Sequence, residues 1–564
     1  MKPKILNSVT PQSGSTLRCK GWKQEAILRM MENNMANGER PAELIIYGGR
    51  AKCARNWESY HAVRNALMQL ENDETLVVQS GMPVAVFRTH RLAPSVIMAN
   101  SNMIQANWPE FNELLEKNLI SFASYTAGPW QYIGSQGVIQ GTFETLGCVA
   151  DRHYGGSLAG KIFLTAGLGG MGQSQPTAMN MHGGISLTIE IDAEKIRNRI
   201  EGGMVDQFAS SLEAAVQLIT EARDEKRSLG VAVHGNAAEC FEALLEKGWR
   251  PDVITEMCPC HDPLAYIPVG YDLETAAKLR RSDPVTYTRL ARESMIRHLR
   301  AMNGFKEQGV PVFEYGTFIR SECITGGMDS AEATIVPGYM VAYVRDMYCE
   351  GRGPFRWTCI SGSVEDQKRL DDLALELFPK DHMVQRWIPL ARDLPVEGLP
   401  ARICFLGFGQ RKKFGLAVNE LVRQGNLAGP VAFARDNLDS GSIANPLSET
   451  ENMKDGSDKV ADWPYLNAML NVAGMADLVT IQANGAMGIS AHTGVTMIAD
   501  GTEEAALRLE ACLTTDAGIG VVRHAQAGYE IAREVAMGKG RLTDESISIP
   551  LWWTPEATFG PDEQ

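Results

Sequence analysis

The stretch Lys161-Ile-Phe-Leu-Thr-Ala-Gly-Leu-Gly-Gly-Met-Gly172 decides the fold of this chain. Apolar residues over 161–166 predict a buried strand, and the glycines after it spell G-x-G-x-x-G. A helix is expected from Pro176 to His182, and a second strand over 185–191 carries Glu190 near its end. In this order the glycines allow a tight turn, the close approach of a pyrophosphate and the packing of helix on strand. The stretch therefore predicts a dinucleotide site rather than a structural turn, and Glu190 would bind the ribose hydroxyls of NAD.

Strands and helices alternate along the middle of the chain. Because such alternation produces parallel sheets, this part predicts a doubly wound α/β domain with ligands at the carboxyl ends of its strands. The expected elements are a helix around 204–227, a strand over 230–234, a helix from Asn236 to Lys247, a strand over 252–256, a helix over 285–307 and a strand over 310–314.

The two flanking parts of the chain combine short strands, helices and glycine-bearing loops. No internal repeat is evident, so the length favours about two to four ordinary domains. The expected elements are helices over 22–34, 108–119, 503–514 and 525–537, strands over 44–49, 76–80, 84–88 and 401–407, a turn region over 132–141, and loops over 352–357, 434–442 and 482–488.

The composition is that of a soluble globular enzyme. The net charge of −14 argues against nucleic acid or an anionic membrane as a partner. No run reaches the length of a membrane span, and the first residues lack a signal-peptide core. The 11 cysteines lie mostly in apolar segments without the spacing of a disulfide scaffold. We therefore expect a cytoplasmic protein that acts on a small molecule.

Arg356, between Phe355 and Trp357, is a candidate carboxylate-binding residue. Its guanidinium can pair with both oxygens of a carboxylate, and the flanking aromatic rings would exclude water. The alternative is a structural ion pair. Tyr47, which precedes two glycines, is a candidate proton donor or a packing residue.

Other reactive side chains have weaker sequence support. Cys404 lies within an apolar strand and by itself predicts an inert core thiol. Asp436 and Asp439 are candidates for acid–base catalysis, or they stabilise their loop by local hydrogen bonds. The segment Cys258-Pro-Cys-His261 crowds its ligands too closely for zinc, so we expect no metal site.

Blocks spread in order over residues 14–540 resemble one known family, urocanate hydratase (urocanase). The blocks are Thr16-Leu-Arg-Cys-Lys-Gly-Trp22, Tyr47-Gly-Gly49, Ala54-Arg-Asn-Trp-Glu58, Gly134-Ser-Gln-Gly137, Gly167-Leu-Gly-Gly-Met-Gly172, Gly235-Asn-Ala-Ala238, Gly353-Pro-Phe-Arg-Trp357, Ala401-Arg-Ile-Cys404, Asp455-Gly-Ser-Asp458 and Arg523-His-Ala-Gln-Ala-Gly-Tyr529.

The resemblance implies a homodimeric hydro-lyase that adds water to an imidazole acrylate and yields an imidazolone propionate. It implies that NAD⁺ stays tightly bound and acts as an electrophile toward the imidazole, not as a hydride acceptor. It also implies three domains: an N-terminal domain over 1–137, a Rossmann-like NAD domain over 138–348, inserted in the chain, and a C-terminal core domain over 349–564.

The resemblance also assigns roles to individual residues. Tyr47 and Arg356 would hold the substrate, Cys404 matches the family's active-site cysteine, and Asp436 falls on its acid–base loop. The residues that would contact NAD⁺ are Gly48, Gly49, Gly170, Met171, Gly172, Glu190, Lys195, Asn236, Ala237, His261, Tyr266, Tyr315 and Gly485.

The chain departs from the family pattern at a few clustered positions. The changes remove imidazoles and amides and introduce Met, Cys, Phe and Ala, which favours a pocket with apolar or sulfur-friendly volume. The departures are Ser124-Tyr125 for Gln-Met, Met257-Cys-Pro-Cys-His-Asp-Pro263 for Gln-Thr-Ser-Ala-His-Asp-Pro, Lys195 for Arg, Thr317-Phe318 for an Asn pair, Asn437 for His, and Gln482-Ala-Asn-Gly-Ala-Met-Gly488 for His-His-Gly-Gly-Gly-Val-Gly.

These departures favour a ring-modified urocanate as the substrate. S-methyl thiourocanate is preferred because of Phe318, Ala483 and Met487, followed by thiourocanate and N-methylurocanate. The alternatives are ordinary urocanate hydratase, an NAD-dependent dehydrogenase and a non-catalytic NAD-binding relative. The presence of Tyr47, Arg356 and Cys404 argues against the last of these.

Overall fold

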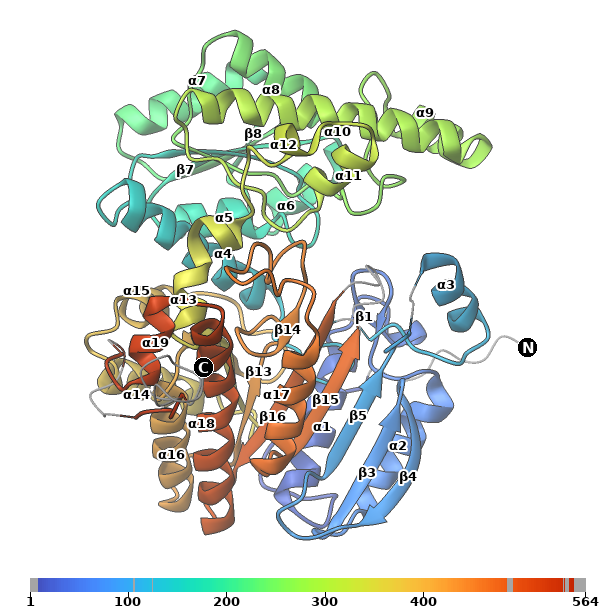
Figure 1. Cartoon of the computed structure of the whole chain (residues 1–564), viewed down its shortest axis with the longest axis vertical. Coiled ribbons are helices and arrows are strands. Elements are labelled where there is room, and N and C mark those ends of the chain that lie inside the picture. The colour runs from blue at the N-terminus through green and yellow to red at the C-terminus, as the bar shows by residue number, and fades with distance from the viewer. Residues whose placement is uncertain are drawn as a thin grey trace, which may run out of the picture. The chain divides into compact units, whose positions relative to one another are not determined.

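The computed structural model describes residues 9–104, 107–123, 125–483, 490–540, 542 and 547–551. The chain divides into two compact units. One comprises residues 138–344, and the other combines the chain before residue 138 with the chain from Arg345 onward. Each unit has its own sheet and is described by itself below (Figure 1).

The 138–344 unit is built on a parallel sheet in the order β10-β6-β7-β9-β8. Strands β6 and β7 are buried along their whole length, which explains the mostly apolar sequence of β6. In β7, buried Ser and Thr alternate with Ile and Leu. The strands are β6 (Ile162–Ala166), β7 (Ile185–Glu190), β8 (Gln207–Ala209), β9 (Leu229–His234) and β10 (Val253–Ile254).

Helices cover both faces of this sheet. The buried core shows the division, since Leu187 of β7 belongs to one cluster with Ile219 of α7, whereas Ala232 of β9 belongs to another with Ile196 of α6. The predicted doubly wound α/β architecture is therefore confirmed. The helices are α4 (Ser135–His153), α5 (Ser174–Met181), α6 (Ala193–Glu201), α7 (Leu212–Asp224), α8 (Ala237–Glu246), α9 (Leu273–Ser282), α10 (Pro284–Glu307), α11 (Ile319–Thr325), α12 (Ser330–Ala333) and the π-helix η2 (Met340–Val344).

Three expectations for this region are wrong in detail. The helix expected around 204–227 covers only the α7 residues, because residues 207–209 form the edge strand β8. Residues 310–314 make isolated bridges with their neighbours instead of a strand. The region 132–141, expected to be turns, enters the long helix α4 at Ser135.

The second unit contains a mixed sheet in the order β12-β11-β13-β16-β15-β5-β3-β4, with β14 paired to β16. The contacts of β5 with β15 and β3 are parallel, and the other neighbours are antiparallel. The strands of this unit are β1 (Ile45–Tyr47), β2 (Ala51–Lys52), β3 (Glu74–Gln79), β4 (Met82–Arg88), β5 (Val96–Asn100), β11 (Gly353–Cys359), β12 (Ala401–Leu406), β13 (Val431–Arg435), β14 (Ile443–Ala444), β15 (Leu478–Ala483) and β16 (Ala491–Ala499).

The two faces of the mixed sheet are covered by different helices. Ala434 and Ile498 pack with Met30 of α1 on one face, called the α1 face below. Phe433 stands close to Gly415 of α16 on the other, called the α16 face. The helices are α1 (Trp22–Ala36), η1 (Pro41–Glu43), α2 (Trp57–Gln69), α3 (Trp108–Glu116), α13 (Arg345–Cys349), α14 (Val364–Leu377), α15 (His382–Ala391), α16 (Gln410–Arg423), α17 (Asp462–Ala473), α18 (Glu503–Gln526) and α19 (Glu530–Ala536).

Two further expectations need correction here. The segment 352–357, expected to be a loop, contributes most of β11, which lies buried between β12 and β13. The helix expected over 503–514 continues to Gln526, so the second helix begins only at Glu530. Within the described residues, no helix is both long and apolar enough to cross a membrane.

Candidate functional site

The glycine turn after β6 has the geometry that its spacing predicts. Gly167 has a φ of +93°, and a Cβ on it would clash with the Met257 carbonyl oxygen. A Cβ on Gly172 would clash with the Gly167 carbonyl oxygen. In contrast, a Cβ on Gly169 or Gly170 would meet nothing within 4 Å. Two glycines are thus required by packing, and the open side of the other two leaves room for a ligand.

This turn lies at the point where the strand order reverses. The chain runs from β6 outward through β7 to the edge strand β8, places β9 between β7 and β8, and then returns to β10 on the other side of β6. Ligands of open parallel sheets bind at the carboxyl ends of the strands at such a point. Glu190 ends β7, and its carboxylate accepts hydrogen bonds from the backbone N–H of Leu168 at 2.6 Å and of Asp192 at 3.0 Å. Glu190 therefore braces the turn, and its oxygens are positioned at the predicted nucleotide site.

The structure places the other predicted cofactor residues of this unit in different surroundings. Asn236 caps α8, directly before Ala237, by accepting from the Ala238 N–H at 3.0 Å. Tyr315 donates to Thr142 Oγ1 at 3.3 Å, and Thr142 contacts Ser174 Oγ at the start of α5 at 3.1 Å. Tyr315 is thus linked to the helix that follows the glycine turn.

The remaining cofactor candidates differ in exposure. Met171, Lys195 and His261 are exposed, and the Lys195 ammonium lies 4.0 Å from Asp192 Oδ2. Tyr266 is buried in the hydrophobic core, with its hydroxyl 3.4 Å from His298 Nδ1. Direct contact with a cofactor stays a prediction for each of these four residues.

Gly48 and Gly49 belong to the other unit and adopt left-handed backbone conformations, with φ of +62° and +68°. Their N–H groups each donate at 3.0 Å to one carboxylate oxygen of Glu39, so consecutive amides form a small anion cradle. Gly485, predicted to contact NAD⁺, and Met487, one of the apolar departures, lie outside the described residues.

Three of the four predicted catalytic residues lie together in this unit. The Arg356 guanidinium pairs with the Asp436 carboxylate through Nη2 and donates to the Gln131 carbonyl through Nη1. Both side chains are largely buried. The Tyr47 hydroxyl accepts from the N–H of Thr126 and, at 2.8 Å, from that of Ala127. Burial raises the pKa of Tyr47, with the Asp436 charge adding to the rise, so Tyr47 stays a neutral phenol at physiological pH.

The expected aromatic flanks of Arg356 are wrong. Because side chains alternate along β11, Phe355 and Trp357 project to the α16 face while Arg356 projects to the α1 face. Phe355 stacks on Phe433 there, with ring centroids 5.4 Å apart. Water is excluded from Arg356 by burial in the sheet and not by its sequence neighbours.

Cys404 lies apart from the other three predicted catalytic residues. It is directly opposite Phe355 in the ladder between β11 and β12, so its side chain projects to the α16 face. The thiol is buried and forms no disulfide. Its catalytic role stays a prediction, and any direct contact with the Arg356–Asp436 pair is disfavoured by this arrangement.

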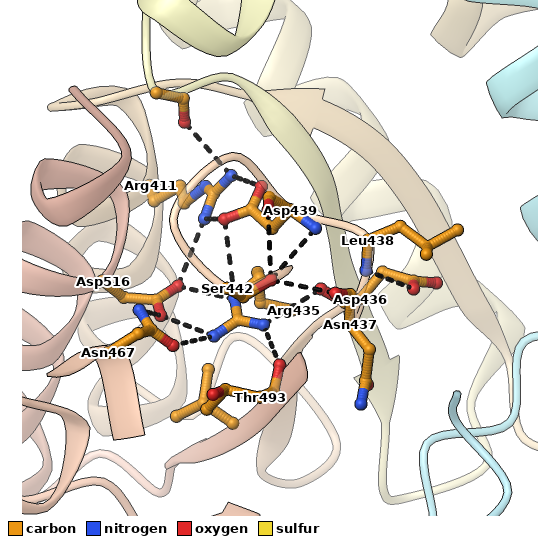
Figure 2. Close-up of polar contacts among 12 residues, drawn as sticks. Arg411, Arg435, Asp436, Asn437, Leu438, Asp439, Ser442, Asn467, Thr493 and Asp516 are labelled. Atoms are coloured by element: carbon orange, nitrogen blue, oxygen red, sulfur yellow. Dashed lines mark hydrogen bonds and ion pairs between the residues drawn. The ribbon is translucent and has the colours of Figure 1, made fainter. Parts of the chain in front are cut away.

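The loop that carries Asp436 is held by a buried ion network (Figure 2). Asp439 accepts from both terminal nitrogens of Arg411, at 2.7 and 2.9 Å, and Asp516 binds Arg435 at 2.8 and 3.0 Å. These four side chains are fully buried. Of the two aspartates left open by the sequence, Asp439 is therefore structural and Asp436 faces the site.

Polar residues continue this site across the sheet, and the sequence had singled out only Gln482 among them. On the α1 face, His492 of β16 and Gln482 of β15 lie opposite each other, and Gln482 receives a hydrogen bond from Asn100 of β5 at 3.2 Å. Gln131 donates to Thr496 Oγ1 at 2.8 Å. A polar residue at every second position of a buried strand is the only local sign of such a site, and it does not identify partners in distant strands.

Three consecutive family models match the chain. They describe the urocanase N-terminal domain over residues 9–131, the urocanase Rossmann-like domain over 134–343 and the urocanase C-terminal domain over 346–538. The chain belongs to the urocanase family. This membership supports a urocanate hydratase-type activity, which is that of a hydro-lyase.

One solved structure is also similar to part of this urocanase-family protein. L-tryptophan dehydrogenase from Nostoc punctiforme is 13% identical, and the match covers 42% of this chain and 67% of that one with a TM-score of 0.16. A score this low carries no argument about fold or function.

A buried acid next to the glycine turn gives a test by pH. Burial raises the pKa of Glu256 from 4.5 to about 8, although Thr317 and the Cys258 N–H donate to its carboxyl. Between these two values the folded protein holds a proton that the unfolded chain releases, so the stability contributed by this group falls as pH rises. We expect Glu256→Gln to gain thermal stability over the native protein as pH rises from about 5 to about 8.5.

Differential scanning calorimetry of both proteins across this range measures the effect. The difference in Tm between them isolates residue 256, because every other titrating group is shared. A difference that stays constant with pH would show that Glu256 titrates normally.

Proposed function

We propose that this protein is an NAD⁺-dependent hydratase that adds water to a ring-modified urocanate, with S-methyl thiourocanate favoured. The proposal rests on family membership together with one arrangement, the buried Arg356–Asp436 pair beside Tyr47. A buried cation is suited to bind the acrylate carboxylate, and a carboxylate and a phenol beside it are suited to manage protons.

The residues of the glycine turn fit NAD⁺. The open faces of Gly169 and Gly170 accommodate a pyrophosphate, and the acid Glu190 disfavours a 2′-phosphate. When bound, the oxidised nicotinamide ring would supply an electron sink for the imidazole. The protein's task at this turn is to hold the dinucleotide by its phosphates and ribose.

The protein's own groups have separable tasks in this proposal. Arg356 has an Nε–H with no hydrogen-bond partner among the described residues, and this donor is available to a substrate carboxylate. Asp436 forms an ion pair with the Arg356 guanidinium and is the candidate to accept or donate a proton. Tyr47 remains protonated and orients the turn that begins at Thr126 through two backbone hydrogen bonds.

The modified substrate is supported by where the departures from the family pattern lie. Tyr125, Asn437 and Gln482 come from three distant parts of the chain and surround His492. Changes confined to one small region beside the catalytic pair are expected when the substrate has changed. Ordinary urocanate is the second candidate, because the catalytic pair and Tyr47 would serve either ring.

An activity panel tests the proposal. Purified protein without added NAD⁺ is expected to convert S-methyl thiourocanate faster than thiourocanate, N-methylurocanate or urocanate, measured as loss of substrate absorbance. Removal of bound dinucleotide should abolish turnover, and added NAD⁺ should restore it.

The panel also separates the alternatives. If urocanate is converted fastest, the hydratase activity is retained as the function, but the modified substrate is rejected. Growth of NADH absorbance in proportion to product would indicate a dehydrogenase instead. Full activity of dinucleotide-free protein would reject the role of NAD⁺. We further propose a homodimer, which light scattering coupled to gel filtration checks directly.

A further inference from the structure

Several fully buried polar atoms on the α1 face have no hydrogen-bond partner among the described residues. They are Gln131 Oε1, Asn437 Oδ1, Thr480 Oγ1 and His492 Nε2. Buried polar atoms are nearly always satisfied in folded proteins, and each exception needs an explanation such as a bound ligand. A group of them in one place, beside a candidate active site, points to a binding site for a polar ligand.

Two of these atoms converge on the same point. A Cβ built on Gly494 of β16 would stand 3.2 Å from Asn437 Oδ1 and 3.4 Å from Gln131 Oε1. Thr480 lies directly opposite Gly494 in the neighbouring strand β15. The Thr480 methyl group faces the glycine, so the polar atoms gathered beside it are the two acceptor oxygens of Asn437 and Gln131. Acceptors of this kind suit an N–H donor of a ligand.

His492 adds a donor to this group. Its Nδ1 lies 2.8 Å from the Asn437 amide nitrogen, which donates to it, so the ring hydrogen is on Nε2. Burial and the Arg435 charge lower the pKa of His492 to about 3, and the ring is therefore neutral. The site offers acceptors at Asn437 and Gln131 and one neutral donor at His492.

Tyr125 forms an aromatic wall beside these groups. Its ring stacks on the His492 ring, with centroids 5.4 Å apart and an interplanar angle of 18°. Its backbone is left-handed, with a φ of +45°, which is unusual for a residue other than glycine. The Gln482 amide donates to the Tyr125 carbonyl and helps hold this conformation. Such backbone strain persists only where surrounding contacts enforce it, and it is concentrated at functional sites.

This group is continuous with the catalytic residues. The Gln131 backbone carbonyl accepts from Arg356 while its side chain lies beside Gly494. Asn437 directly follows Asp436, and Tyr125 directly precedes Thr126, which is bonded to Tyr47. A ligand with its carboxylate on Arg356 would therefore extend its ring toward Asn437 and His492.

We propose that Tyr125, Asn437 and His492 form the subsite that selects the ring of the substrate, and that this subsite fits an imidazole acrylate carrying a thioether on the ring carbon between the nitrogens. The inference rests on the proposed function and assigns its specificity. A ring with one N–H and one bare nitrogen satisfies Asn437 Oδ1 and the His492 Nε2–H together. The Tyr125 ring supplies an aromatic surface for the thioether sulfur.

The same chemistry disfavours the other candidate substrates to different degrees. A thione ring carries two N–H groups and would set a donor against the His492 donor. A neutral N-methylated ring has no N–H for Asn437, and its methyl group replaces that hydrogen. Plain urocanate satisfies both polar groups but leaves the Tyr125 surface uncovered, so the aromatic wall decides between it and the thioether.

The experiment measures kcat/KM of the full-length holoenzyme for S-methyl thiourocanate and for urocanate, and compares their ratio among variants. Tyr125→Met removes the ring and is expected to lower the ratio about 10- to 100-fold. Tyr125→Phe keeps the ring and is the matched control, so its ratio should stay within about threefold of the native value. Asn437→Ala should lower kcat/KM for both substrates together, because both rings carry the N–H.

The outcomes distinguish this inference from the proposed function. If the native protein converts no imidazole acrylate, the proposed function fails. If the native protein is active but Tyr125→Met keeps the native ratio, or Tyr125→Phe loses as much as Tyr125→Met, the subsite is overturned. Should Tyr125→Met fail to fold, Gln482→Met takes its place, since it releases the Tyr125 carbonyl and keeps the Tyr125 ring, although it also removes the acceptor of Asn100. A native ratio in a folded Gln482→Met protein would equally overturn the proposal.

Discussion

Replacing Arg356 by methionine is expected to lower kcat/KM for the acrylate substrate by about a thousandfold or more, which corresponds to about 4 kcal/mol of transition-state stabilisation. The guanidinium is buried on the α1 face, and its Nε–H has no hydrogen-bond partner in the described part of the chain. A substrate carboxylate that binds the guanidinium exchanges its hydrogen bonds with water for hydrogen bonds with a charged donor. Because the site has a low dielectric, a hydrogen bond of this kind is strong. Steady-state kinetics on the purified variant measures the loss.

Two comparisons separate substrate binding from folding. Arg402 of β12 is also buried, and its ion pair with Asp371 lies on the α16 face. Arg402→Met should therefore lower stability but keep the activity of each folded molecule. The amide analogue of the acrylate provides the second comparison, since it has no carboxylate. The native enzyme should prefer the acid strongly, whereas Arg356→Met should not. A variant within about threefold of native kcat/KM would show that Arg356 is only structural.

The glycine turn was predictable because its requirements are local. Gly167 and Gly172 are required by contacts with backbone atoms a few residues away or in the segment that follows the adjacent strand β10, and a short pattern records such constraints. The strands and helices around the turn were also predictable, because each has its own period of apolar residues in the sequence. Family membership was predictable for the same reason, since its blocks are short segments.

The β11 segment shows what the sequence could not provide. Glycine, proline and two arginines within 352–357 favoured a loop, yet Arg352 and Arg356 are both buried and paired, with Asp381 and Asp436 respectively. The partners come from other parts of the chain, so no local pattern announces that these charges can be buried. The expected aromatic shielding of Arg356 failed because a strand sends neighbours in sequence to opposite faces.

Gln131 and His492 were missed for a related reason. Each is a single polar residue in a mostly buried segment. Gln131 lies beside Gly494, and His492 contacts Asn437 and Tyr125, so the partners of each residue are distant in the sequence. The clustering of departures from the family pattern favoured a changed pocket, and this stays a prediction. Only the strand pairing shows that three of these departures surround one histidine.

Replacing Asp516 by alanine is expected to cost about 3–5 kcal/mol of stability, comparable with the whole folding free energy of a small domain. Its carboxylate binds Arg435 and Arg411, and Asn467 donates to it at 3.0 Å (Figure 2). The variant leaves two buried guanidinium groups with one carboxylate, Asp439. Because Arg435 ends β13 just before Asp436, the loop that carries Asp436 should loosen as well. Thermal unfolding should show a fall of roughly 10 °C in Tm, or the protein should not accumulate in soluble form.

The charge balance of the network makes a sharper form of this test. Glu365, in an exposed pair with Lys368 at 2.8 Å, is the control: Glu365→Ala should cost less than about 1 kcal/mol. The double variant Asp516→Leu, Arg435→Met removes one charge of each sign and leaves the Arg411–Asp439 pair intact. Since an unpaired buried charge costs more than a missing pair, the double variant should be more stable than Asp516→Ala alone. If the losses in unfolding free energy from the two substitutions simply add, the network holds the loop through packing, and the buried charges contribute nothing of their own.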